Sequence, residues 1–183
     1  MLFILPPALG VALGLLLGGS SANWGNIRVR WPWLIVVVLV VRIAIGFSPV
    51  GTIDALRYVY ILTIVGFLVW ALMQFRALPG IWIAVIGAAM NLLVMLANGG
   101  HMPVSPVSGF TPAHAGGLYI VGDSTTSLNW LGDWIGIPGI LGGAASPGDF
   151  LIALGVGVTA FLITRRRPPA TKLLEETTSS MGR

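Results

Sequence analysis

Few residues of this chain could take part in acid–base or metal chemistry. The sequence holds two histidines, His101 and His114, and no cysteine. The two imidazoles lie thirteen residues apart with no glutamate nearby, so they would supply at most part of a metal site or a haem ligand pair. We expect structural or surface roles for both. The absence of cysteine excludes thiolate catalysis, zinc–thiolate sites and iron–sulfur clusters.

The aspartates offer a second candidate chemistry. Asp123, Asp133 and Asp149 each follow a glycine. Asp149 stands three residues after Ser146, with Pro147 between them, which predicts a capping box at the start of a helix. For Asp123 and Asp133 we expect turns, in which aspartate bonds local amides. Calcium binding is the alternative, but the spacings of 10 and 16 residues match no known calcium loop.

No combination of residues predicts catalysis. The first glutamate is Glu175 and the first lysine is Lys172, and no spacing supports a Ser–His–Asp arrangement or a phosphate-binding loop. We therefore expect no enzyme activity, no metal and no cofactor.

The composition predicts that these residues are positioned by membrane helices. The chain of 183 residues is 56% hydrophobic and 9% charged, against roughly 25% charged in a soluble domain. Seven of its sixteen charged residues lie in the last nineteen. The bilayer is therefore the expected solvent. The net charge of +4 comes from cations that flank apolar runs, not from a basic stripe, so we expect no nucleic-acid binding.

Five apolar runs have the length needed to cross about 30 Å of hydrocarbon as helices. They predict an all-α integral membrane fold in a single domain, 1–164, with a long loop, 99–147, between the fourth and fifth helices. The polar tail, 165–183, is expected to be disordered. The predicted spans are 2–19, 31–48, 54–75, 79–98 and 148–164.

The cations predict the orientation of these spans. Eight of them fall in the loop 20–30, the turn 76–78 and the tail, whereas the loops on the other side hold none. Positive charge marks the cytoplasmic side. We therefore expect a membrane protein with its N-terminus and the loop 99–147 outside and its tail in the cytoplasm.

The first run carries Gly10, Gly14 and Gly18 at four-residue spacing. This pattern predicts a face on which another membrane helix packs closely. The small residues at 20–22 also fit a signal-peptide cleavage site, but the run lacks a basic start and a cleaved signal needs no such face.

Three polar residues, Arg42, Thr63 and Asn91, are predicted at one depth near the centre of the bilayer. They lie eleven residues from Trp31, Gln74 and Gly80, respectively, which are at the cytoplasmic ends of the three spans. A charge there costs roughly 2.5 to 3.5 kcal/mol, which the surrounding aliphatic residues offset. We expect Arg42 to donate hydrogen bonds to Asn91 and Thr63 inside the bundle. This cluster either only fixes helix register or also meets an anionic ligand or lipid.

Within the long loop, the segment 128–141 is too apolar to float free and too short to span. It is expected to lie in the outer interface or to re-enter and fold onto the helix ends. The loop and the span beside it carry three motifs: NGGHMPVS at 98–105, LGDW at 131–134 and SPGDFLI at 146–152. The candidate site residues within these motifs are Asn98, Gly99, Gly100, His101, Pro103, Asp133 and Asp149.

These motifs resemble the signature of small bacterial integral membrane proteins grouped as domain of unknown function 5317. The resemblance covers nearly the whole chain. It implies a polytopic protein of the bacterial cytoplasmic (inner) membrane and brings no catalytic or ligand-binding residue with it.

Two functions remain. The first is a non-catalytic accessory or scaffold subunit, whose glycine face and outer loop bind other membrane proteins within the lipid bilayer. The second is a small transporter or a ligand- or lipid-binding membrane protein that uses the polar cluster around Arg42. We favour the first, because it needs no site chemistry.

Overall fold

The computed structural model describes residues 2–47, 53, 55–106, 117–137 and 143–166. Five helices account for most of them, one within each predicted apolar run. They are α1 (Leu5–Leu16), α2 (Pro32–Phe47), α3 (Leu56–Met73), α4 (Ile81–Ala97) and α5 (Pro147–Thr164). By length and composition, α3 and α5, of 18 residues each, are long and apolar enough to cross a membrane. The other three are shorter apolar helices.

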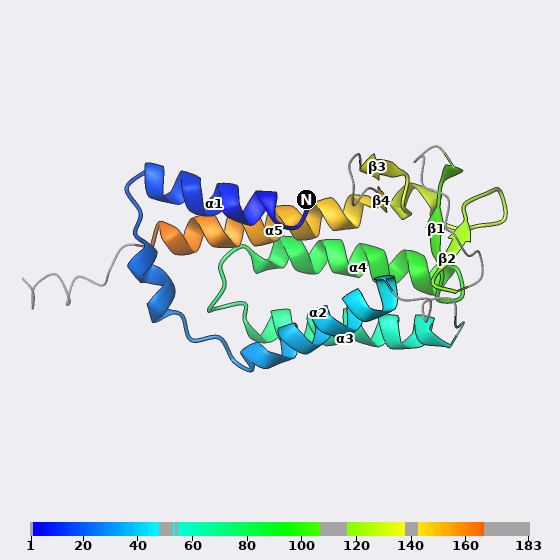
Figure 1. Cartoon of the computed structure of the whole chain (residues 1–183), viewed down its shortest axis with the longest axis horizontal. Coiled ribbons are helices and arrows are strands. Elements are labelled where there is room, and N and C mark those ends of the chain that lie inside the picture. The colour runs from blue at the N-terminus through cyan, green and yellow to red at the C-terminus, as the bar shows by residue number, and fades with distance from the viewer. Residues whose placement is uncertain (1, 48–52, 54, 107–116, 138–142, 167–183) are drawn as a thin grey trace, which may run out of the picture.

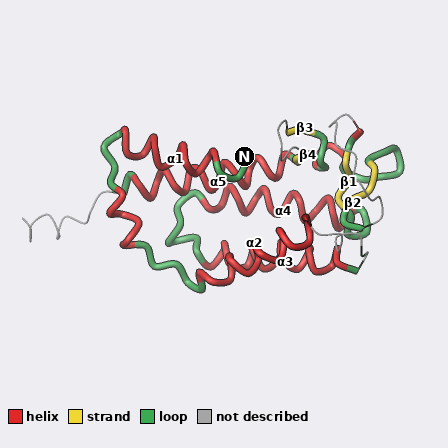
Figure 2. The backbone as a smooth tube through the Cα atoms, viewed as in Figure 1, coloured by secondary structure: helices red, strands yellow, loops and turns green. Residues whose placement is uncertain are grey.

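The helices lie in a row that does not follow their order in the sequence. The neighbours are α1 with α5, α5 with α4, α4 with α3, and α3 with α2 (Figure 1). The last helix in the chain therefore lies between the first and the fourth. Short loops and the 3-10 helix η1 (Ser21–Asn26) lie at one end of the helices, and the strands lie at their other end (Figure 2).

Small residues allow α5 to approach both of its neighbours. On the α1 side, Gly10 and Gly14 are buried, and a Cβ added at Gly14 would lie 2.6 Å from the Cβ of Thr164. On the α4 side, a Cβ at Gly87 would lie 2.8 Å from the backbone nitrogen of Ile152. Close backbone approach of this kind is how small residues join membrane helices. The glycine face predicted on the first run therefore packs within this chain.

The prediction that Gly18 belongs to this face is wrong. The helix ends at Leu16, and Gly18 is exposed with φ +85° and no atom within 4 Å of an added Cβ. It serves the left-handed turn that ends the helix. Its neighbour Gly19 reaches α5 instead, where an added Cβ would lie 2.8 Å from the carbonyl carbon of Thr164.

Strands correct the all-α prediction. In the region predicted as a loop, β1 (Met102–Val104) pairs in parallel with β2 (Tyr119–Val121), and β3 (Ile135–Ile137) pairs antiparallel with β4 (Gly143–Ala145). A 3-10 turn, η4 (Asn129–Leu131), contacts the ends of α4 and α5. We call these elements, with residues 98–106, 117–137 and 143–146, the cap.

Two buried apolar clusters hold the molecule together. One joins the cap to the helices, through Ile64 of α3, Val94 of α4, and Met102 and Leu131 of the cap. The other lies toward the opposite end and includes Trp70, Leu78, Ile81, Ala84 and Ile163. The burial of Leu131 explains why the segment 128–137 folds onto the helix ends.

Candidate functional site

The cap begins with a turn that ends α4. Asn98 donates from Nδ2 to the carbonyl oxygens of Val94 and Ser127, both at 2.8 Å, and its Oδ1 accepts from the N–H of Ser127 at 2.8 Å. Gly99 and Gly100 then adopt φ +64° and +95°, a backbone conformation that favours glycine. Asn98 thus fixes the loop at 127 to the end of the helix.

His101 joins the cap to α3. Its Nδ1 lies 2.8 Å from the carbonyl oxygen of Gly117, which can only accept, so Nδ1 carries the proton. Its Nε2 then accepts from Nη1 of Arg57 at 3.2 Å. A Cβ at Gly100 would lie 2.9 Å from Cδ of Arg57, so that glycine leaves the space the arginine occupies. His101 is placed as a structural residue; His114 lies outside the described residues.

Asp133 lies in a parallel bridge and not in the turn that its Gly-Asp pair predicts. It faces Val104, and its N–H donates to the carbonyl oxygen of Pro103 at 2.8 Å. The N–H of Ser105 donates to the carbonyl oxygen of Asp133 at 2.9 Å. A Cβ at Gly132 would lie 2.6 Å from the oxygen of Pro103, so only glycine permits this close approach. Pro103 and Asp133 are both buried.

Asp123 forms the predicted turn. Its Oδ1 accepts from the hydroxyl of Thr125 at 2.6 Å and from the N–H of Thr125 at 2.7 Å. The hydroxyl bond, and after it the N–H bond, holds the pKa of the Asp123 carboxyl below its ordinary value. Asn129 completes the turn by donating to the carbonyl oxygen of Asp123 at 2.7 Å.

The capping box predicted at the start of α5 is present. The side chain of Ser146 accepts from the N–H of Asp149 at 3.0 Å, and Oδ2 of Asp149 accepts from the N–H of Ser146 at 3.0 Å. The sequence did not predict the third member. Asn91 of α4 donates from Nδ2 to Oδ1 of Asp149 at 2.9 Å, and its Oδ1 lies 2.8 Å from the Ser146 hydroxyl. A polar residue inside an apolar helix was the only signal for it.

The predicted polar layer is described only in part. Thr63 donates its hydroxyl to the carbonyl oxygen of Tyr60, one turn earlier in its own helix, at 2.6 Å. Asn91 bonds to the α5 capping box. The side chain of Arg42 lies outside the described residues, so its contact with Asn91 and Thr63 stays a prediction.

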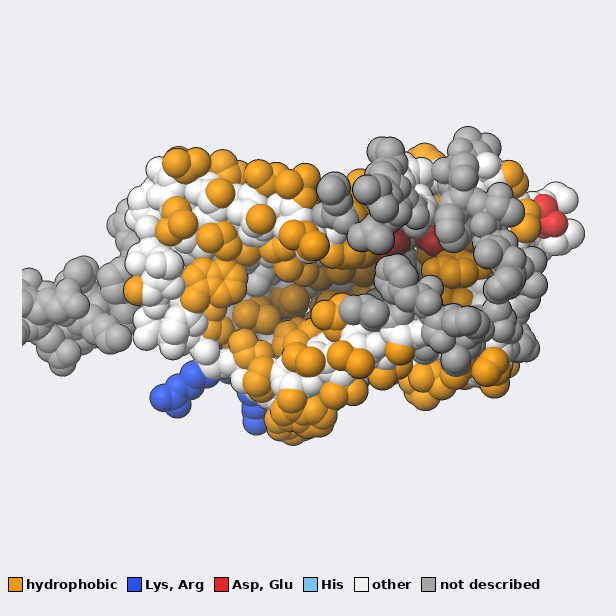
Figure 3. Space-filling view, in the orientation of Figure 1, with side chains coloured by type: hydrophobic (Ala, Val, Ile, Leu, Met, Phe, Trp, Pro, Cys, Tyr) orange, Lys and Arg blue, Asp and Glu red, His pale blue; other side chains and the backbone are white. Residues whose placement is uncertain are grey.

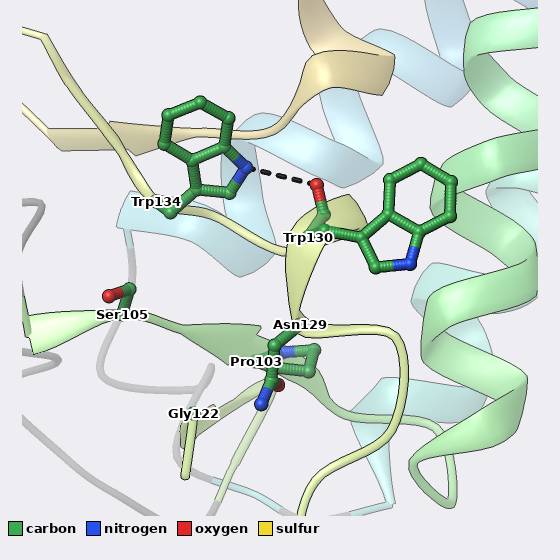
Figure 4. Close-up of a pocket in the computed structure, with 6 residues that line it drawn as sticks. All are labelled: Pro103, Ser105, Gly122, Asn129, Trp130 and Trp134. Carbon is green, nitrogen blue, oxygen red and sulfur yellow. Dashed lines mark hydrogen bonds between the residues drawn. The ribbon is translucent and has the colours of Figure 1, made fainter.

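The cap surface holds a pocket of about 350 Å³ (Figure 4). Trp130 and Trp134 stand beside it with 66% and 46% of their surfaces exposed, and Nε1 of Trp134 donates to the carbonyl oxygen of Trp130 at 3.0 Å. The described residues form no group of three or more acidic, histidine or cysteine side chains that could hold a metal. The pocket lining offers two indole rings, the amide of Asn129 and the hydroxyl of Ser105 for contact with a bound group. The pocket is lined by Pro103, Ser105, Gly122, Asn129, Trp130 and Trp134.

Residues 26–161 match a family of unknown function, DUF5317. The chain belongs to this family. The DUF5317 match includes the cap and its three motifs, whereas α1 precedes it. Neither a curated protein nor a solved structure matches the chain.

Proposed function

We propose that this DUF5317 protein is a five-span protein of the bacterial cytoplasmic membrane that serves, without catalysis, as an accessory or scaffold subunit of a membrane protein assembly. In this proposal the cap lies outside the membrane and presents Trp130 and Trp134 to a partner protein. The observation that carries the proposal is the exposure of this indole pair on a cap whose backbone is held by hydrogen bonds.

The separation of charge supports the orientation. The described acidic residues Asp123, Asp133 and Asp149 all belong to the cap end. Five described arginines are exposed at the ends of the helices opposite the cap, as the positive-inside rule requires of the cytoplasmic side, whereas Arg57 lies at the cap end beside His101. The five exposed arginines are Arg28, Arg30, Arg76, Arg165 and Arg166.

The packing of α1 changes which surface faces the partner. Gly10 and Gly14, expected to bind another protein, are covered by α5 of the same chain. The cap retains two large exposed indoles, and tryptophan is enriched among the residues that dominate binding at protein interfaces. A rigid aromatic anchor also loses little conformational entropy on binding. We therefore assign the partner surface to the cap.

The partner surface is tested by purification in mild detergent of a tagged chain expressed at its native level, followed by mass spectrometry. We expect a stoichiometric membrane protein with the wild type and its loss with Trp130→Ala/Trp134→Ala. Trp33→Ala is the matched control, because Trp33 is 59% exposed at the opposite end. A monodisperse lone protein would refute the scaffold role, and a partner retained by the cap variant would refute the assignment of the partner surface to the cap.

The orientation is tested separately with engineered cysteines, since the chain has none. Ser124 lies in the exposed cap turn and Ser21 begins η1 at the other end. Ser124→Cys should react with an impermeant thiol reagent in intact cells, and Ser21→Cys should react only after lysis. The reverse pattern would place the cap in the cytoplasm.

A further inference from the structure

A short extended segment at the end opposite the cap presents two arginines on one face. Along residues 27–30, Ile27 and Val29 are half-buried and pack on the apolar cluster around Trp70, whereas Arg28 and Arg30 are exposed. Alternate residues of an extended chain point to opposite sides. Arg28 and Arg30 therefore share the outward side; we call this stretch the arginine segment.

Gln74 holds the arginine segment in place. Its side chain is fully buried, and it pairs with the backbone of Arg30 as a neighbouring strand would. Oε1 accepts from the N–H of Arg30 at 3.0 Å, and Nε2 donates to the carbonyl oxygen of Arg30 at 3.0 Å. The indole N–H of Trp70 donates to the same oxygen at 3.0 Å. A backbone fixed in advance loses less entropy when its side chains bind a ligand.

The surroundings of the segment favour an anion next to hydrocarbon. Helix α2 begins at Pro32 with no acidic residue in its first turn, so the positive end of its dipole adds to the two guanidinium groups. Trp31 and Trp33 are exposed directly after the segment, as expected of residues at the level of lipid headgroups. Figure 3 shows basic side chains projecting at this end beside an apolar surface.

We propose that Arg28 and Arg30 bind the phosphate of an anionic phospholipid, whose acyl chains lie along α2. The exposed apolar residues Val36 and Val37 lie one turn into that helix. Guanidinium groups bind phosphate oxygens in paired, charge-assisted hydrogen bonds, which a lysine ammonium does not reproduce. This inference rests on the membrane insertion in the proposed function, but not on the partner surface of the cap.

The test is native mass spectrometry of the full-length protein in detergent, titrated with phosphatidylglycerol or phosphatidylcholine of identical acyl chains. We expect preference for phosphatidylglycerol. Arg28→Gln/Arg30→Gln should lower the affinity for phosphatidylglycerol by about 30-fold. This factor corresponds to a loss of about 1 kcal/mol for each of the two arginines near an anionic lipid. Arg28→Lys/Arg30→Lys should give an intermediate affinity. Lys172→Gln/Arg183→Gln removes the same net charge from outside the arginine segment and should stay within about twofold of the wild type, because the proposed site depends on Arg28 and Arg30 and not on net charge.

Several results would overturn the site. An unchanged affinity in Arg28→Gln/Arg30→Gln would do so, and an equal loss in the tail variant would show general attraction only. Lysines that match the arginines would exclude paired guanidinium bonds. Displacement of the lipid by excess inorganic phosphate would assign the site to free phosphate, whereas its retention supports the lipid.

Gln74→Met tests the positioning role separately. With both arginines present, the variant should bind phosphatidylglycerol more weakly than the wild type, and an unchanged affinity in a folded variant would overturn that role. The proposed lipid site lies at the end of the molecule opposite Trp130 and Trp134, so lipid binding and partner binding can be lost independently. If the wild-type protein has no membrane protein partner but still binds lipid, the proposed function alone is therefore refuted.

Discussion

Replacing Asn91 by leucine should destabilise the contact between α4 and α5. Asn91 is 5% exposed, and its Nδ2 donates to a carboxylate oxygen of Asp149 at 2.9 Å. The hydroxyl of Ser146, which lies near Oδ1 of Asn91, also lies 2.9 Å from Oδ2 of Asp149. Its single proton can therefore go to the aspartate in the variant. The loss is then one hydrogen bond to a charged group.

A hydrogen bond to a charged group contributes about 1.5 to 3 kcal/mol, and leucine has the branched shape of asparagine but a larger volume, so we expect a loss of at least about 2 kcal/mol. Hydrogen bonds between membrane helices average only about 0.6 kcal/mol, which makes the two estimates separable. Equilibrium unfolding in mixed micelles would measure the difference. Met90→Leu, a volume-conserving change at the preceding residue, is the control. A loss of about 0.6 kcal/mol or less for Asn91→Leu would refute charge assistance.

Three further changes test other parts of the structure. Gly14→Leu should lower the thermal midpoint sharply because it forces α1 away from α5, while Ala12→Leu, exposed on the same helix, should not; equal midpoints would make the glycine face incidental. Gly100→Ala should lower the yield of folded protein, because its φ is +95° and Arg57 fills the space, and an unchanged yield would contradict this. Acidification should loosen the Asp123 turn: the lowered pKa means the ionised carboxyl stabilises the folded turn above its unfolded pKa, and this is lost as pH falls through the folded value. The NMR chemical shift of the Thr125 amide should change as the pH falls through the pKa of Asp123, and a shift that does not change would contradict this prediction.

The helices were predictable because their signal is local. Each apolar run contains one helix, and Ser146 and Asp149 identify the start of α5 by spacing alone. The ends of α1 were placed too far apart, since hydropathy continues through Gly18 while the backbone turns there. Four-residue spacing marks a possible face, but it cannot show where a helix ends.

The cap was not predictable for a different reason. Strands of three residues, such as Met102–Val104, are too short to carry an alternating pattern. The bridge between Val104 and Asp133 joins residues far apart in sequence. Local sequence therefore did not reveal it, and the pair Gly132-Asp133 was interpreted as a turn. The bond between Asn91 and Asp149 depends on how α5 is rotated against α4. That rotation follows from the close contact at Gly87, which the sequence does not specify.

The position of α5 in the row has a consequence for how the protein is made. Gly10 is translated 147 residues before Gly157, whose carbonyl oxygen it approaches. At about 5 to 20 residues per second, α1 waits roughly 7 to 30 s for its neighbour to emerge. During that time the side of α1 that is buried in the folded protein lacks the helix that covers it. The first helix to be synthesised is thus among the last to reach its native packing, and any nascent chain cut short before α5 leaves it without its partner.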